Sequence, residues 1–560
     1  MSQNNKSPET KLPRKRRQNK GRPLNPEALI QIETLLSGRE LKSDLLIEYL
    51  HLVQDEYKQL SLDHLLSLAH LLRIAPVKVH EVASFYHHFD VAQDGDQPAD
   101  ITVRVCDSIS CEMAGAESLI DSLKQTYKEP NIRIQRVPCI GRCAEAPVAV
   151  VGQNPVNHAT VESITTHVSA GNTAAATIPS TMESYLAEGG YSTITKLLAG
   201  EQSVEDVIET LKTANLRGLG GAGFPLATKW NILRSQATPR WMAINIDEGE
   251  PGTFKDRVYL EKQPHALLEG ILIAGWAIES SNCILYVRDE YPAIITALNT
   301  AIEELQQWAT FDLPTFEVRR GAGAYICGEE SAMIESIEGK RAYPRQRPPY
   351  IAEVGLYGQP TLEHNCETLY WVPKLLRDGP EFFADEGRRD RVGLRSFSIS
   401  GRVNNPGVHF APAGISMREL IEEYCGGMQE GHELYGYLPG GASGGILPAS
   451  LADEPMDFDT LQKHGCFIGS AAVIVFSQHD KARDIAKNAM SFFAHESCGQ
   501  CTPCRVGTQK ASQLMNAPKW DVDLLESLCT TMEDASICGL GQAAPNPLRS
   551  VVRFFPEEIS

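Results

Sequence analysis

The sequence lacks a long apolar run. Nowhere in its 560 residues does a stretch of about 18 consecutive apolar residues occur, the length that a membrane-spanning helix needs. The first residues also lack the apolar core of a secretory signal, so we expect a cytoplasmic protein. An excess of positive charge is missing as well. The formal net charge is −19, which argues against general binding of nucleic acid.

One local exception is a basic segment at residues 1–24. Its positive charges include Lys11, Arg14, Lys15, Arg16, Arg17, Lys20 and Arg22. Such a run can bind nucleic acid or an acidic partner. Because no aromatic or fold-forming residue accompanies the charges, we predict a disordered, solvated arm.

The chain is long enough for about three to five domains, and its composition changes several times. Helical spacing of apolar residues predicts a small bundle first, and β-rich runs around an amphipathic helix follow. The predicted segments after the arm are a helical bundle at 25–95, a β-rich domain at 96–168, a Gly/Ala/Thr-rich linker at 169–181, an α/β domain at 182–394, a β-rich module at 395–480 and a helical domain at 481–560.

Cysteine spacing is the most informative feature. The chain has 14 cysteines, and Cys498, Cys501 and Cys504 follow one another at C-x2-C-x2-C spacing, with Cys538 further along. This pattern is typical of a [4Fe–4S] cluster held by four thiolates. A structural zinc site also takes four cysteines, but it is usually built from two C-x2-4-C knuckles, so the triple run with one remote cysteine favours the cluster. The spacing also fits a reducing compartment better than a disulfide scaffold.

A second set lies in the first half of the chain, with Cys106 and Cys111 followed by Cys139 and Cys143. The first pair directly follows a strand-like run. Four ligands on two loops suit a [2Fe–2S] cluster, although zinc remains possible on spacing alone. The other cysteines have no partner spacing and are predicted to be small buried residues: Cys283, Cys327, Cys366, Cys425, Cys466 and Cys529. Of these, Cys529 is the one rival of Cys538 for the fourth position of the later cluster.

The α/β segment opens with a glycine-rich loop at residues 216–225, followed by Lys229. Glycines let a backbone approach a phosphate closely, and amides at a helix start can bind its oxygens. A loop of this kind is a weak signal by itself. Further blocks rich in Gly, Asn and acidic residues follow at 245–254, 321–330 and 364–369.

Taken in this order, the blocks resemble the flavin-binding 51-kDa-type subunit of respiratory complex I over residues 182–560. Residues 79–89 and the first cysteine set resemble its 24-kDa-type subunit over residues 25–165. The resemblance implies an α/β multidomain fold: a helical bundle with a thioredoxin-like [2Fe–2S] domain, a Rossmann-like FMN domain, a ubiquitin-like β-grasp (SLBB) module and a C-terminal helical bundle with a [4Fe–4S] cluster. In that family His80, His87 and His88 are packing or helix-surface residues, so we expect no metal there.

The resemblance also implies which residues hold the cofactors. The FMN set comprises Gly218, Gly220 and Lys229 at the phosphate, Asn245, Asp247, Glu248 and Gly328 along the ribityl chain and isoalloxazine, and Asn365 as a further polar contact. The NAD set comprises Phe224 as adenine platform with Glu250, Tyr325, Glu329, Glu330, Arg347 and Tyr350 around it. Acidic residues beside a dinucleotide bind ribose hydroxyls and discourage a 2′-phosphate, which favours NAD over NADP. No acid–base residue is expected, because hydride transfer on FMN near Glu250 and Glu330 requires orientation rather than proton transfer.

Some positions depart from the family pattern. Leu219 stands where the family usually has an arginine, Leu226 and Ala227 replace a Thr-Gly pair, and His364 replaces an asparagine. None of these positions belongs to the core flavin set. We expect them to affect affinity rather than cofactor identity.

The implied function is electron exchange between NAD(H) and a partner, with FMN converting hydride to single electrons for the clusters. The [4Fe–4S] cluster is expected to be the flavin's immediate partner, and the [2Fe–2S] cluster a side store or branch. The sequence has no molybdopterin domain and no nickel-ligand pairs, so we predict one subunit of a larger assembly.

Fusions of this kind occur in two assemblies. The blocks at 286–293 and 367–372 resemble more closely the β subunits of NAD-dependent formate dehydrogenases, which implies a molybdenum- or tungsten-containing α subunit as partner and conversion of formate and NAD⁺ to CO₂ and NADH. The alternative is the diaphorase subunit of an NAD-reducing [NiFe] hydrogenase. A hypothesis from another class is a zinc-stabilised scaffold or redox sensor without turnover.

Overall fold

The computed structural model describes residues 21–560, so the predicted basic arm lies outside the described part except for its last four residues. In these last four residues of the arm, Arg22 forms ion pairs with Asp63 and Asp94. No helix in residues 21–560 combines the length and the apolar character that a bilayer span requires.

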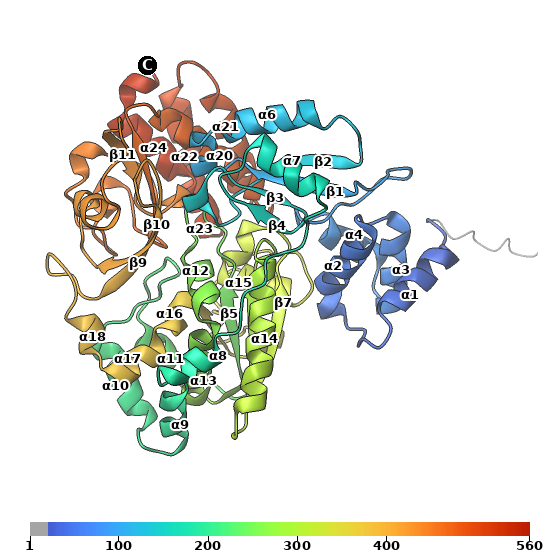
Figure 1. The fold of residues 1–560 in the computed structure, drawn as a ribbon, viewed down its shortest axis with the longest axis horizontal. Helices are drawn as coiled ribbons and strands as arrows, with labels where there is room; N and C mark the ends of the chain where they lie inside the picture. Colours follow the sequence, from blue (N-terminus) through green and yellow to red (C-terminus); the bar gives the residue numbers. More distant parts are fainter. Residues whose placement is uncertain (1–20) are drawn as a thin grey trace, which may run out of the picture.

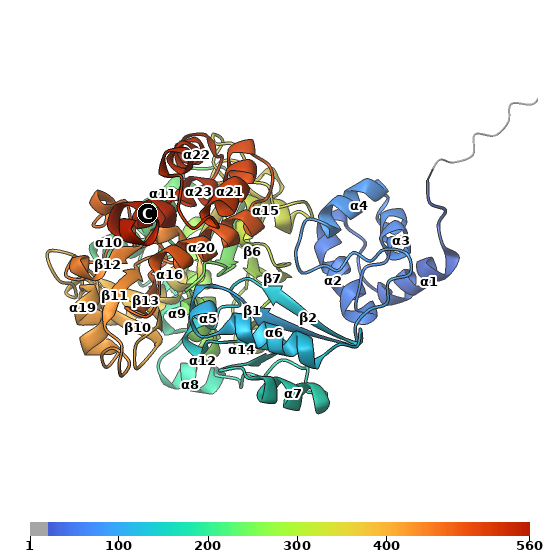
Figure 2. The same ribbon diagram turned by 90° about the horizontal axis from the view of Figure 1, so that it is seen from above.

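A four-helix bundle follows and stands to one side of the molecule in both views (Figures 1 and 2). Its helices are α1 (Pro26–Leu35), α2 (Leu46–Tyr57), α3 (Leu62–Leu72) and α4 (Pro76–Ala83). Helix α1 begins where the Asn25 side chain accepts the backbone N–H groups of Glu27 and Ala28. The fully buried Leu50 and Leu68 belong to the apolar core.

A small sheet of order β2-β1-β3-β4 comes next. Its strands are β1 (Ile101–Cys106), β2 (Ile132–Val137), β3 (Ala149–Val151) and β4 (Asn154–Val156), accompanied by helices α5 (Ile109–Met113), α6 (Ala116–Thr126) and α7 (Val161–Ser169). Because β1 and β2 run parallel, the cysteine loops that follow these two strands emerge at the same edge of the sheet.

The central sheet has the order β7-β6-β5-β8 and all its pairings are parallel. The strands are β5 (Arg240–Ile246), β6 (Ser280–Val287), β7 (Thr315–Arg320) and β8 (Thr361–Asn365). The surrounding helices are α8 (Met182–Ala187), α9 (Ser192–Leu198), α10 (Val204–Thr213), α11 (Leu226–Arg234), α12 (Lys255–Lys262), α13 (Pro264–Ile278), α14 (Pro292–Trp308), α15 (Glu330–Ile337), α16 (Cys366–Tyr370), α17 (Val372–Asp378) and α18 (Glu381–Ala384). Ligands of such sheets bind at the carboxyl ends of the strands, where Asn245 and Asn365 lie opposite each other on adjacent strands.

A five-stranded mixed sheet of order β10-β9-β13-β11-β12 forms the next module. Its strands are β9 (Leu394–Gly401), β10 (Gly407–Pro412), β11 (Leu434–Leu438), β12 (Leu447–Pro448) and β13 (Ala472–Ser477), and the short helix α19 (Met417–Glu419) follows β10. The neighbouring strands β9 and β13 are parallel.

The chain ends in the helices α20 (Ala482–Glu496), α21 (Thr502–Met515), α22 (Val522–Ala535), α23 (Gly539–Ala543) and α24 (Pro545–Phe554), which cluster together in Figure 1. Three sheets with helices throughout confirm the predicted α/β multidomain fold class.

Candidate functional site

The four cysteines of the first set come together in a buried space. The Sγ atoms of Cys139 and Cys143 are 3.2 Å apart. The Cys106 thiol interacts with those of Cys111 and Cys139, and Cys143 lies near Cys111. Hydrogen bonds that their S–H groups donate to neighbouring cysteines raise the pKa of Cys106 and Cys143 well above the usual range. Four mutually adjacent thiols are the donor set that a [2Fe–2S] cluster requires.

Two arginines of the central domain hold the loop of Cys139 and Cys143. Arg288 Nη2 donates to the Cys139 carbonyl at 2.6 Å, and Arg257 Nε donates to the Gly141 carbonyl at 2.9 Å. Both arginines are buried, with 4% and 3% of their surface exposed. The first cysteine set is therefore anchored on the central domain by contacts between residues more than 100 positions apart.

The second set gathers between the C-terminal helices. Cys498 and Cys501 lie in the link between α20 and α21, Cys504 lies in the first turn of α21, and Cys538 precedes α23. Charge interactions connect Cys504 with Cys498 and Cys501, and Cys538 with Cys498. This set also offers four thiols and fits a [4Fe–4S] cluster. Cys529 is buried within α22, where its charged neighbours are Arg549, Glu526 and Glu533.

The glycine-rich loop forms a closed cradle in front of α11. Gly218 N donates to the Phe224 carbonyl at 2.8 Å, and Leu219 N donates to Thr368 Oγ1 at 2.9 Å. At Gly220 a Cβ would lie 2.9 Å from the Asn365 Cβ, so only glycine fits there without displacing a neighbour. The Leu219 side chain packs inward with the apolar core rather than toward the cradle.

Among the residues predicted for FMN, two buried oxygens have no hydrogen-bond partner within residues 21–560: Asn365 Oδ1, on a side chain that contacts Gly220, and Asp247 Oδ2. A buried, unpaired oxygen is costly unless a ligand donates to it. Gly328 lies against Asp247, where a Cβ would approach the Asp247 carbonyl to 3.3 Å. Asn245 Nδ2 donates to the Gly328 carbonyl at 3.0 Å. These acceptors and the space left by glycines fit a ligand with several hydroxyl and N–H groups, as FMN has.

Lys229 and Glu248 have protein partners. Lys229 Nζ lies 3.0 Å from Oε2 of Glu363, and the other carboxylate oxygen of Glu363 accepts from Asn245 Nδ2 at 3.2 Å. Glu363 was not among the predicted residues, because a single acidic residue within a strand carries no motif. The Glu248 carboxylate accepts from the backbone N–H groups of Asp256 and Arg257 at the start of α12, at 2.9 and 3.3 Å. Its side chain therefore holds α12.

The residues predicted for NAD divide into exposed aromatics and paired charges. Phe224 and Tyr350 are 46% and 54% exposed, so both side chains are accessible to a ligand. Glu250 accepts from Ser443 N at 2.7 Å and from the Tyr325 hydroxyl. The remaining predicted residues form one ion-pair group at the start of α15, in which Arg347 binds both Glu329 and Glu330.

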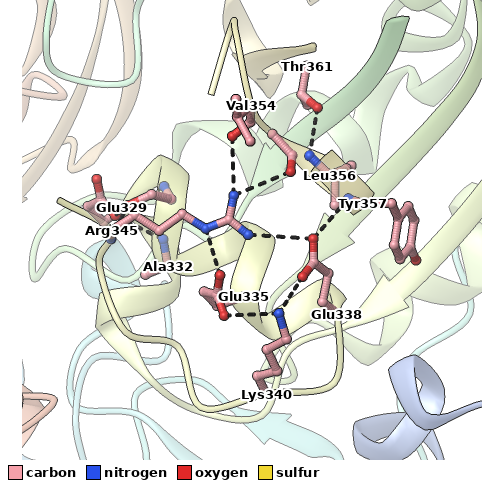
Figure 3. Close-up of polar contacts among 12 residues, drawn as sticks. Glu329, Ala332, Glu335, Glu338, Lys340, Arg345, Val354, Leu356, Tyr357 and Thr361 are labelled. Atoms are coloured by element: carbon pink, nitrogen blue, oxygen red, sulfur yellow. Dashed lines mark hydrogen bonds and ion pairs between the residues drawn. The ribbon is translucent and has the colours of Figure 1, made fainter. Parts of the chain in front are cut away.

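The segment that carries Arg347 and Tyr350 is held by Arg345, which the sequence patterns did not single out (Figure 3). Arg345 Nε donates to Glu335 Oε1 at 2.6 Å, and Nη1 donates to the carbonyls of Val354 and Gly355 at 3.3 Å. A planar guanidinium can bridge these directions at once, whereas an ammonium group cannot. A cavity of about 400 Å³ next to this segment reaches from Arg345 and Arg347 to Cys538.

We expect Arg345→Lys to raise the KM for NADH about tenfold with little change in kcat, because the segment carrying Arg347 and Tyr350 loses its anchor. FMN and iron contents should be unchanged. Steady-state kinetics with a dye acceptor measure the effect. Arg341→Lys is the matched control, because Arg341 lies in the same segment but does not bind its carbonyl groups: it forms a 3.5 Å ion pair with Glu81 and lies over the Tyr343 ring. Equal KM values for the two variants would contradict the anchoring role of Arg345.

The histidines predicted as packing or surface residues connect the helical bundle to the rest of the molecule. His88 Nδ1 lies 2.6 Å from Asp289 Oδ2, while the other oxygen of Asp289 accepts from Arg320 at 2.5 Å. The His87 ring stacks on His495 with centroids 4.0 Å apart. His80 is exposed on α4. Since Asp289 is already paired with His88 and Arg320, we assign these three residues to the contact between the helical bundle and the central domain.

Glu496 is buried at the end of α20, two residues before Cys498. Its Oε2 accepts from Tyr325 N at 2.8 Å, and burial raises its pKa from 4.5 to about 8. The folded protein therefore keeps a proton that the unfolded chain loses, so this group makes the protein less stable as pH rises from 4.5 toward 8.

Glu496→Gln removes this pH-dependent loss of stability, because an amide does not titrate. We expect the melting temperature of the variant to rise relative to wild type between about pH 6 and about pH 8. The measurement is thermal unfolding of both proteins at equal iron content. A difference in melting temperature between the two proteins that stays constant across this pH range would contradict the raised pKa of Glu496.

The regions that contain these residues match known protein families. Residues 211–374 match the family described as the Nuo51 FMN-binding domain, residues 484–560 match the NADH-ubiquinone oxidoreductase-F iron-sulfur binding region, and residues 32–171 match the thioredoxin-like [2Fe-2S] ferredoxin. These descriptions confirm the predicted cofactors FMN, [4Fe–4S] and [2Fe–2S].

Among curated relatives, an NADH-quinone oxidoreductase F subunit of Rhizobium meliloti (strain 1021) is 40% identical over 392 residues, 67% of this chain and 93% of the relative. The NADH-quinone oxidoreductase F subunit of Aquifex aeolicus (strain VF5) is 39% identical over 392 residues, 67% of this chain and 90% of the relative. Among solved structures, an NAD⁺-reducing [NiFe]-hydrogenase in the H₂-reduced state gives a TM-score of 0.82 at 30% identity, with 93% of each chain covered. The chain therefore belongs to the family of NADH-quinone oxidoreductase F subunits and carries a thioredoxin-like [2Fe-2S] ferredoxin region in the same polypeptide.

Proposed function

We propose that this chain is the diaphorase subunit of a larger oxidoreductase, exchanging electrons between NAD(H) and a partner subunit. The observation that carries the proposal is the presence of one ligand cradle and two four-thiol sets in a single chain. When bound, FMN exchanges hydride with nicotinamide and single electrons with iron–sulfur clusters. The chain's own residues position these groups and exclude water from them.

The residue assignments are part of this proposal. The FMN residues are Gly218, Gly220, Lys229, Asn245, Asp247, Glu248, Gly328 and Asn365, with Glu248 acting through α12. The NAD residues are Phe224, Glu250, Tyr325, Glu329, Glu330, Arg347 and Tyr350. The cluster ligands are Cys106, Cys111, Cys139 and Cys143 for [2Fe–2S], and Cys498, Cys501, Cys504 and Cys538 for [4Fe–4S]. The buried, unpaired oxygens of Asn365 beside Gly220 and of Asp247 beside Gly328, together with the mutual proximity of the thiols, support these sets.

For the partner, we propose the molybdenum- or tungsten-containing α subunit of a formate dehydrogenase, which gives the overall conversion of formate and NAD⁺ to CO₂ and NADH. The sequence blocks at 286–293 and 367–372 support this choice. The second candidate is an NAD-reducing [NiFe] hydrogenase, favoured by the likeness to a solved hydrogenase chain over 93% of this chain.

Two observations test these proposals. The chain purified without oxygen should be brown, release a fluorescent flavin on denaturation, and reduce ferricyanide with NADH. A colourless protein with stoichiometric zinc would instead support a scaffold or sensor. Co-purification with the native partner decides the assembly, since molybdenum or tungsten supports formate dehydrogenase and nickel supports hydrogenase.

A further inference from the structure

The Asn365 amide has a fixed orientation. Its Nδ2 donates to Asp256 Oδ2 at 2.7 Å, while its Oδ1 is buried and unpaired among the described residues. An ionised carboxylate can only accept, so the amide nitrogen must face Asp256. Gly220 packs against the Asn365 Cβ from the cradle side. The unpaired oxygen is therefore the part of Asn365 left to serve the cradle.

A buried lysine keeps Asp256 in the accepting state. Lys255 Nζ lies 2.7 Å from Asp256 Oδ1 and 3.0 Å from Glu367 Oε2, and the three residues are only 1% to 2% exposed. Because an ammonium group can only donate, Asp256 Oδ1 accepts from Lys255, and Oδ2 accepts from the Asn365 amide nitrogen. Both carboxylate oxygens therefore act as acceptors, and the oxygen of a reversed Asn365 amide would find no donor there.

We propose that Lys255 and Asp256 are positioning residues that turn the Asn365 Oδ1 toward the cradle, where it accepts an N–H or O–H group of FMN. The inference rests on the proposed placement of FMN beside Gly220. If the amide were reversed, its Nδ2 would face the ligand, and the donor of FMN would meet a second donor. Lys255 and Asp256 therefore act on the flavin through Asn365 and need not touch it.

We call the contacts that run from Lys255 through Asp256 to Asn365 the relay. An exchange of its donor and acceptor residues tests it. Asp256→Asn places two amide groups side by side, so either Asn365 turns over or an amide nitrogen faces Lys255. Asn365→Asp places two carboxylates at hydrogen-bond distance. In the double variant, the new asparagine can accept from Lys255 and donate to the new aspartate, which still presents an oxygen to the cradle. We expect each single change to weaken FMN binding about 30-fold and the double variant to bind within about threefold of wild type.

FMN binding is measured by quenching of flavin fluorescence on full-length protein with intact clusters, after flavin removal and re-addition. The matched control is Glu269→Gln, a carboxylate that is 1% exposed and bonded to the Tyr185 hydroxyl on α8 and to the Tyr191 N–H at the start of α9 rather than to a residue of the cradle. It should lower the melting temperature without changing FMN affinity.

Four results would overturn the proposal. The first is a double variant no better than the weaker single variant. The second is FMN affinity that falls only in proportion to the melting temperature of the flavin-free protein and its iron content. Lys255, Asp256 and Asn365 would then contribute to folding alone. The third is a wild-type chain that binds no FMN, which would also remove the proposed function. FMN binding that persists in the wild type and in all variants would remove the relay alone.

Discussion

Cys501→Ser is expected to abolish electron exchange with the partner subunit while leaving NADH-dependent dye reduction within about threefold of wild type. Cys501 lies directly before α21, among the thiols of the second set and away from the glycine cradle. A serine hydroxyl is a harder and poorer ligand for iron than a thiolate. Since even changes beyond the ligand shell cost about 10- to 100-fold at metal sites, loss of a ligand should reduce partner-linked turnover at least about 100-fold.

The experiment compares two activities of the same holoenzyme. One is NADH-dependent reduction of a dye that accepts electrons at the flavin, and the other is NAD⁺ reduction driven by the substrate of the partner. Cys529→Ser is the matched control, because Cys529 is a buried cysteine of the same helical domain whose charged neighbours are Arg549, Glu526 and Glu533. It should retain both activities. Equal loss of both activities in Cys501→Ser would contradict the assigned order of electron transfer.

The features predicted from sequence are those that local spacing determines. Three thiols within one short run must lie close together, wherever the run sits in the fold. The glycine-rich loop is likewise local, because Gly218 and Phe224 close it through a hydrogen bond across six residues. The iron–sulfur clusters followed from cysteine spacing, whereas FMN followed from the resemblance of several blocks to a known family, and the descriptions of the matched regions agree with both.

The supporting contacts could not be predicted in this way, because they join residues far apart in the chain. Asp256 meets Asn365 across 109 positions, and Arg288 meets the loop of Cys139 across 149 positions. The direction of a side chain is also hidden from sequence. Glu248 belongs to a motif of the flavin block, yet its carboxylate holds the start of α12. The choice between formate and hydrogen depends on a second chain, so this sequence constrains it only through resemblance.

Gly220→Ala is expected to weaken FMN binding about 100-fold, and NADH-dependent dye reduction should fall with the flavin content. The added Cβ would lie 2.9 Å from the Asn365 Cβ. Asn365 cannot easily withdraw, because it ends strand β8 and its amide is held by Asp256 at 2.7 Å. The methyl group would therefore displace either the loop or the acceptor oxygen that faces the cradle. Iron content should stay at the wild-type level, since both cysteine sets lie on other segments.

Gly218→Ala distinguishes two causes of weakened FMN binding: displacement of Asn365 and direct exclusion of the ligand by the added methyl group. At Gly218 the nearest atom to an added Cβ is the Phe224 carbonyl oxygen at 3.5 Å, an ordinary contact, so the loop itself can accept the methyl group. Flavin titration of the two variants should show the larger loss for Gly220→Ala, because only that change strikes Asn365. An equal loss at both positions would mean that the added methyl groups exclude the ligand directly. The Asn365 contact would then contribute little to the cradle, and the glycines would act by leaving room for the phosphate.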